Sequence, residues 1–169
     1  RVYTLNRGSL HGVETGMPVI TADGVVGSVS EVGINWCRVT SILEINASAG
    51  AYDERSGAVG LSEGTYELRE EGLCRLAYLA EGADVAIGDR ILTSGFGSVY
   101  PQGLVIGTVC EIRSDDYTRQ QIAILTPAVD FDRLSRVMIV TDCTIIPVDP
   151  DAATENMPAE GEGGEPNVG

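Results

Sequence analysis

The sequence contains no lysine and only one histidine, and these absences exclude several functions. All 11 basic residues are arginine, against 25 acidic residues, which gives a formal net charge of −14. Nucleic-acid binding is disfavoured because it relies on clustered positive charge. A Walker-type phosphate loop is excluded because it requires a lysine. A serine hydrolase triad would have to use His11, since the triad needs a histidine to accept the proton of the nucleophile.

Long apolar runs and paired cysteine motifs are also missing. No stretch approaches the ~20 apolar residues of a transmembrane helix, and the chain opens on the strand-like Arg1-Val2-Tyr3 rather than on a signal peptide. This beginning is consistent with a fragment that lacks a targeting segment. With no CxxC pair, a zinc site is disfavoured, and we expect no metal and no cofactor.

The four cysteines each lie in or beside an apolar, strand-like run, which favours buried and unreactive thiols. Four cysteines also allow three disulfide pairings, and the sequence does not choose among them. An outward-facing location would favour bridging. These residues are Cys37, Cys74, Cys110 and Cys143.

What is present is the two-residue period of β-strands, interrupted by frequent glycine. Residues 105 to 112 alternate between two faces, and residues 137 to 146 form a β-branched run. The best helix candidate is a single turn around Asp130 to Arg136. Many short strands joined by Gly-rich turns predict an all-β barrel or sandwich.

A weak internal repeat links two parts of the chain. GMPVIT at Gly16–Thr21 resembles GDRILT at Gly88–Thr93, and GSVSEV at Gly27–Val32 resembles GTVCEI at Gly107–Ile112. The spacing is eight residues longer in the second copy, and the extra length is the loop TSGFGSVYPQ. The repeat predicts two related β units, although such a pattern also recurs by chance in β proteins.

After Ile146 the composition changes. Residues 147–169 hold four of the seven prolines and almost no large apolar residue, which predicts a disordered tail. The 28 residues from Asp142 onward contain seven acidic residues and no basic one. We therefore expect a solvated acidic tail, with recruitment of a partner as the alternative.

The loop after Thr93 decides between an enzyme and a binding protein. Ser94 lacks the glycine two residues earlier that a nucleophile elbow requires, so the loop is interpreted as structural and no catalytic residue is assigned. Gly95 and Gly97 favour positive φ. Exposed aromatic groups on a rigid loop are typical of a protein-binding surface, although Phe96 could instead plug a barrel end. The candidate partner-binding residues are Thr93, Ser94, Gly95, Phe96, Val99, Tyr100 and Pro101.

Five segments match, in order, a known family of bacterial proteins. The most specific pattern is GD-x-(apolar)₂-TSG followed by P-x-G-(apolar)₃-G-x-V. In these segments the chain resembles the extracytoplasmic domain of the rod shape-determining protein MreC family. Phe96 and Ser98 stand where that family more often has Leu and Gly. The segments are Asn6–Ile20, Asp23–Val32, Ala58–Leu61, Leu76–Leu79 and Val85–Val109.

The resemblance implies an all-β fold of two small six-stranded-type β-barrel domains with Gly-rich turns. It implies a non-enzymatic scaffold of the cell-elongation complex, or elongasome, that binds and helps to activate the peptidoglycan transpeptidase to maintain rod cell shape. An N-terminal membrane helix and a coiled coil would precede the barrels, on the extracytoplasmic face of the cell membrane (periplasm or cell-wall side). The implied partners are the elongation-specific penicillin-binding transpeptidase, MreD, RodA and MreB, with self-association to dimers or larger assemblies.

We expect the two units to be interleaved along the chain. The strand at Val2–Leu5 is predicted to join the later unit, because that unit looks complete only with a borrowed strand. The predicted domains are residues 1–12 plus 75–146, residues 13–74, and the tail 147–169. A chymotrypsin-like serine hydrolase and a small-ligand-binding barrel are the alternative functions.

Overall fold

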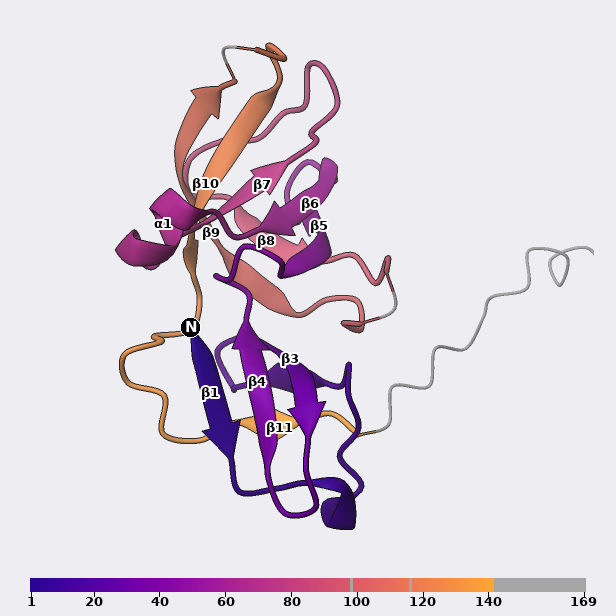
Figure 1. Cartoon of the computed structure of the whole chain (residues 1–169). Helices are drawn as coiled ribbons and strands as arrows, with labels where there is room; N and C mark the ends of the chain where they lie inside the picture. Colours follow the sequence, from indigo (N-terminus) through magenta and orange to yellow (C-terminus); the bar gives the residue numbers. More distant parts are fainter. Residues whose placement is uncertain (98, 116, 142–169) are drawn as a thin grey trace, which may run out of the picture.

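The chain folds into two antiparallel β-sheets with almost no helix (Figure 1). The computed structural model describes residues 1–97, 99–115 and 117–141. The predicted tail and Cys143 lie outside these residues. The predicted all-β class is confirmed. The elements are β1 (Val2–Leu5), η1 (Ser9–His11), β2 (Pro18–Ile20), β3 (Val25–Val32), β4 (Cys37–Ser41), β5 (Ser48–Asp53), β6 (Val59–Glu63), α1 (Tyr66–Glu71), β7 (Cys74–Ala77), β8 (Arg90–Thr93), β9 (Val105–Ser114), β10 (Gln121–Pro127) and β11 (Met138–Ile139).

One sheet is a closed barrel of six strands in the order β10-β7-β6-β5-β8-β9. Alternation along the strands places small or branched apolar side chains inside, such as Ala49 and Ala51 on β5 and Ala123 and Leu125 on β10. Closure leaves this sheet without a free edge. One of the two predicted barrels therefore exists as a closed six-stranded barrel.

The other sheet has five strands in the order β1-β4-β3-β2-β11. Val2 pairs with Thr40 and Leu5 with Cys37, so the predicted pairing of Val2–Leu5 with the unit 75–146 is wrong. The barrel needs no borrowed β1 because β5 and β6, from the segment 13–74, complete it. The strand that crosses between the units is instead β11, which returns from the barrel to pair with β2.

The predicted repeat corresponds to two hairpins with the same register. In β2–β3, Val19 pairs with Gly27 and a bulge follows; in β8–β9, Ile91 pairs with Gly107 and a bulge follows. A Cβ atom at Gly27 would lie 2.0 Å from the carbonyl oxygen of Thr40 on the neighbouring strand. A Cβ atom at Gly107 would likewise overlap the carbonyl oxygen of Thr126, so both glycines permit close backbone approach.

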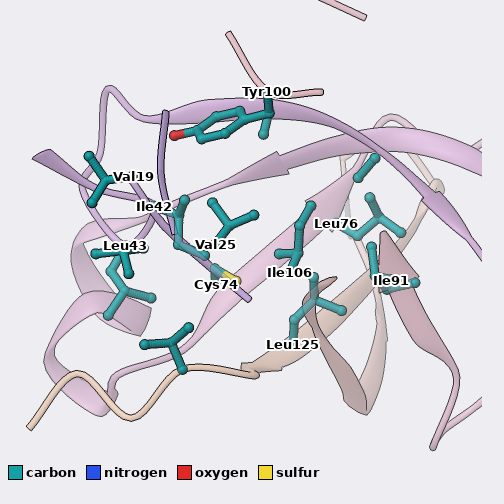
Figure 2. Close-up of a cluster of buried hydrophobic side chains, with 14 of the residues drawn as sticks. Val19, Val25, Ile42, Leu43, Cys74, Leu76, Ile91, Tyr100, Ile106 and Leu125 are labelled. Atoms are coloured by element: carbon teal, nitrogen blue, oxygen red, sulfur yellow. The ribbon is translucent and has the colours of Figure 1, made fainter. Parts of the chain in front are cut away.

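A single apolar core connects the two sheets. Val19 and Val25 from the five-stranded sheet belong to the same buried cluster as Ile91, Ile106 and Leu125 from the barrel. Figure 2 shows these side chains converging from both sheets. The sheets are therefore held together by burial of apolar surface.

The one α-helix among the described residues was not predicted. In α1, the Thr65 hydroxyl accepts a hydrogen bond from the Leu68 amide at 3.3 Å, and Gly72 ends the helix at φ 72°. The predicted helical turn around Asp130 to Arg136 is wrong, because the Asp130 carboxylate accepts a hydrogen bond from the Asp132 amide and closes a turn.

Candidate functional site

The loop from Thr93 to Pro101 is the elaborated part of the second hairpin, and Thr93 holds its base. The Thr93 hydroxyl donates to the Pro101 carbonyl at 2.6 Å and accepts from the Leu104 amide at 2.9 Å. Backbone bonds from Thr93 to Leu104 and from Gly103 to Thr93 close the same base. Thr93 is fully buried. It is therefore a structural residue rather than a contact residue.

The glycines shape the loop as predicted. Gly95 has φ 80° and Gly97 has φ 90°, in the left-handed region that side chains with a Cβ rarely adopt. The Ser94 amide donates to the Gly50 carbonyl at 2.9 Å, and the Ser94 hydroxyl accepts from the Phe96 amide at 3.4 Å. These bonds anchor the loop to β5 of the barrel.

Phe96 projects from this loop, with 75% of its surface exposed. The alternative that Phe96 plugs a barrel end is therefore wrong. The residue borders a hollow of about 260 Å³, which Leu61 and Val99 also line. An exposed aromatic side chain beside an apolar hollow is a typical protein-contact surface.

Tyr100, by contrast, is only 7% exposed, so its predicted exposure is wrong. Tyr100 belongs to the same buried cluster as Val25 and Ile42, and Figure 2 shows its ring above these two side chains. Burial raises the pKa of its phenol to about 12. Tyr100 thus ties the loop to the core. Val99 and Pro101 are half-buried beside it.

The residues of a serine hydrolase are not brought together. His11 lies in η1, between β1 and β2 of the five-stranded sheet, and its Nδ1 accepts from the Gly8 amide at 3.3 Å. Ser94 follows β8 of the barrel and bonds only within the loop and to β5 in the described part of the chain. The arrangement offers no histidine base to Ser94.

An acidic cluster at the start of β8 was missed by the sequence reasoning. The Arg55 guanidinium donates to both carboxylate oxygens of Asp89 at 2.8 Å and to Asp84 at 2.8 Å. These bonds lower the pKa of the Asp89 and Asp84 carboxyls. Asp53, fully buried, accepts from the Arg55 amide and the Ser56 hydroxyl. The cluster connects the β5–β6 turn to the segment that precedes β8. In the sequence, only the Gly-Asp pair at the start of the GDRILT motif indicated it.

The cysteines are free thiols of two kinds. Cys37 and Cys74 are buried, and burial raises the pKa of the Cys74 thiol to about 12. Cys110 is exposed, so the prediction of a buried thiol is wrong there. Cys110 follows the buried Val109 and lies on the outer face of β9 together with the exposed Thr108, as strand alternation requires. It is also the unpaired residue of a bulge, because Val109 and Glu111 pair with the consecutive residues Leu125 and Ile124 of β10.

Two absences concern residues 1–97, 99–115 and 117–141. No group of three or more His, Cys, Asp or Glu side chains is arranged to hold a metal ion there. The same residues contain no helix that is long and apolar enough to cross a membrane.

Comparison with known proteins places this fold in a family. The family model described as rod shape-determining protein MreC, barrel core, matches residues 1–141. The cell shape-determining protein MreC of Bacillus subtilis (strain 168) is 31% identical over 147 residues, which cover 81% of this chain and 50% of that protein. The chain therefore spans about half the length of the curated relatives it matches.

Solved structures share the architecture. The crystal structure of MreC from Pseudomonas aeruginosa superposes with a TM-score of 0.75 at 28% identity, covering 82% of this chain and 88% of that one. A complex between penicillin-binding protein PBP2 and MreC from Helicobacter pylori matches with a TM-score of 0.60 at 16% identity, covering 72% of this chain and 74% of that one, and this likeness shows the fold alone. With the family model matched over every described strand, the chain belongs to the rod shape-determining protein MreC family.

Proposed function

We propose that this chain is the barrel core of a non-enzymatic scaffold that acts in bacterial cell elongation and maintains rod cell shape. The match to the MreC barrel core over residues 1–141 is the observation that carries the proposal. The scaffold would be anchored in the cell membrane by a segment outside this sequence and would act on the extracytoplasmic face. A scaffold function also agrees with the separation of His11 from Ser94.

The partner proposed for this chain is the elongation-specific penicillin-binding transpeptidase. The Helicobacter pylori relative is known in a complex with PBP2, a penicillin-binding protein. MreD, RodA, MreB and a second copy of the scaffold would complete the assembly. Such a scaffold activates an enzyme only if it binds the active conformation more tightly than the inactive one, and a coupling of about 1–3 kcal/mol is typical.

The contact surface proposed for this partner is the Thr93–Pro101 loop, with Phe96 as its anchor. Phe96 is exposed, stands on a loop with several backbone hydrogen bonds, and borders the hollow lined by Leu61 and Val99. Hydrogen bonds that hold the base of the loop before binding reduce the conformational entropy lost on binding, which favours affinity. Thr93 and Tyr100 would support this surface from below, because both are buried.

The test is binding of the chain to the soluble extracytoplasmic part of its cognate transpeptidase, measured by interferometry. We expect Phe96→Ala to weaken binding at least about tenfold, as loss of an aromatic anchor commonly does. Tyr117→Ala is the matched control, because Tyr117 is 99% exposed and lies in the β9–β10 turn rather than in the loop. Both variants should keep the unfolding midpoint of the parent.

Two results would contradict the proposal at different levels. Parental affinity in a folded Phe96→Ala variant would reject the loop as the contact surface. If the parent chain does not bind at concentrations well above micromolar, the barrel core is not sufficient for the interaction. Transpeptidase turnover measured with and without the chain then tests activation separately from binding.

A further inference from the structure

The five-stranded sheet has two edges that no described strand covers. β1 pairs with β4 and β11 pairs with β2, and these strands end the sheet on either side. The Ser41 amide donates to the Arg1 carbonyl. In an antiparallel pair only every second residue bonds to the neighbouring strand, so Arg1, Tyr3 and Leu5 face β4 with their backbone groups. The backbone groups of Thr4 therefore point away from β4. By the same alternation, the Val140 amide bonds to Pro18 and the backbone groups of Ile139 point away from β2.

The two edges border a seam that opens into the core. One cavity of about 210 Å³ lies between Tyr3–Leu5 of β1 and residues 134–137, with Val19, Val26 and Val39 among its lining. A second hollow of about 640 Å³ continues between residues 5–7 and 135–141. Tyr3, Leu5, Val137 and Ile139 pack on the core but remain half-buried along this seam.

The strand directions allow one strand to fill the seam. Each neighbouring pair in the order β1-β4-β3-β2-β11 is antiparallel, so β1 and β11 run in the same direction. A single strand running antiparallel to both would complete an all-antiparallel barrel. That barrel would have six strands, the same number as the closed barrel of β5–β10.

The charge of the seam indicates what occupies it. Arg7, His11 and Arg136 line the larger hollow, and neither lining contains an aspartate or glutamate. This is unusual in a chain with a net charge of −14. Thr141, the last described residue, also lines this hollow. The acidic Asp142 follows it directly, six further acidic residues lie beyond position 148, and none of the 28 residues after Thr141 is basic.

We propose that residues 142–148 of this chain, the docking segment, fold back after β11 and occupy the seam as a sixth strand. A segment that reverses direction after β11 runs antiparallel to β11 and therefore also to β1. Consecutive strand residues face opposite sides, so either Ile145 or Ile146 enters the apolar cavity beside Tyr3 and Leu5. Pro147, which has no amide hydrogen, ends the pairing.

Amide hydrogen exchange of the 169-residue chain, followed by NMR, tests this placement. The Thr4 and Ile139 amides have no partner in the described part of the chain, so they should be protected only if the docking segment pairs with them. The double variant Ile145→Ser, Ile146→Ser should raise the exchange rates of both amides by about tenfold or more. Met157→Ser with Val168→Ser removes apolar side chains elsewhere in the same tail and should leave both rates unchanged.

The outcome can overturn the proposal in two ways. Free exchange of the Thr4 and Ile139 amides in the parent chain would show that the seam is open. Protection that rises with protein concentration and survives the double isoleucine variant would assign the seam to a second copy instead. The Val39 amide, in the middle of the sheet, reports in every sample that the fold is retained.

Discussion

Replacing Thr93 by valine tests how the candidate contact loop is held. Valine has nearly the same shape as threonine but cannot donate to the Pro101 carbonyl or accept from the Leu104 amide, which Thr93 does at 2.6 and 2.9 Å. Each hydrogen bond contributes about 1 kcal/mol net, and a buried partner left unsatisfied adds a further penalty. Pro101 and Leu104 are half-buried, so water can reach them in part. We expect Thr93→Val to lower the free energy of unfolding by about 2–3 kcal/mol.

Urea unfolding followed by circular dichroism measures this change. With an m-value of about 1–3 kcal/mol/M, the midpoint should fall by roughly 0.7–3 M. Thr108→Val is the matched control, because Thr108 lies exposed on β9, and its hydroxyl makes no hydrogen bond within the described residues. A change below about 0.5 kcal/mol in Thr93→Val, within the range of a surface substitution, would refute the assignment of Thr93 as the residue that closes the loop.

Two other perturbations address the ion cluster and the core. Pairing with Arg55 lowers the pKa of the Asp89 carboxyl in the folded protein, so this stabilisation is complete above the pKa of an unfolded aspartate, about 3.9, and is lost as the pH falls below it. In an acid titration followed by circular dichroism, Arg55→Met should therefore unfold at a higher pH than the parent. The control Arg38→Met, which breaks the exposed pair with Glu31, should unfold at the same pH as the parent. Equal midpoints for Arg55→Met and the parent would contradict the role of Arg55. Leu125→Ala should cost about 2–5 kcal/mol in urea unfolding because Leu125 is fully buried in the barrel. The control Leu10→Ala, on a side chain that is 74% exposed, should cost little, and similar losses in both would contradict the position of the core.

The local features of the chain were largely predictable. Alternation of apolar residues indicated the β class, and the repeated motifs indicated two related β units, which the structure shows to be hairpins β2–β3 and β8–β9 with the same register. Gly95 and Gly97 take positive φ as expected, because a glycine-rich turn restricts the backbone locally. The Thr65 and Gly72 caps of α1 were also visible in the sequence and could have revealed that helix.

The errors concern contacts between distant residues. The apolar run around Cys110 favoured a buried thiol, but the run does not show which face of β9 enters the core, and Cys110 lies on the outer face with Thr108 while Val109 is buried. Periodicity likewise shows that Val2–Leu5 is a strand without naming its partner, and β4 became that partner. Tyr100 was predicted to be exposed because it lies on a turn, but it is buried in the cluster that contains Val25 of the five-stranded sheet.

The sequence by itself determined the all-β class, the internal repeat, the positive φ of the loop glycines and the family, because each follows from residues close together in the chain. Tertiary structure alone decided that β11 returns to β2, that Tyr100 is buried while Phe96 remains exposed, and that Arg55 joins Asp84 to Asp89. These outcomes depend on which surfaces meet when two sheets bury a common core, and burial of apolar area is non-directional and carries no local signature in the sequence.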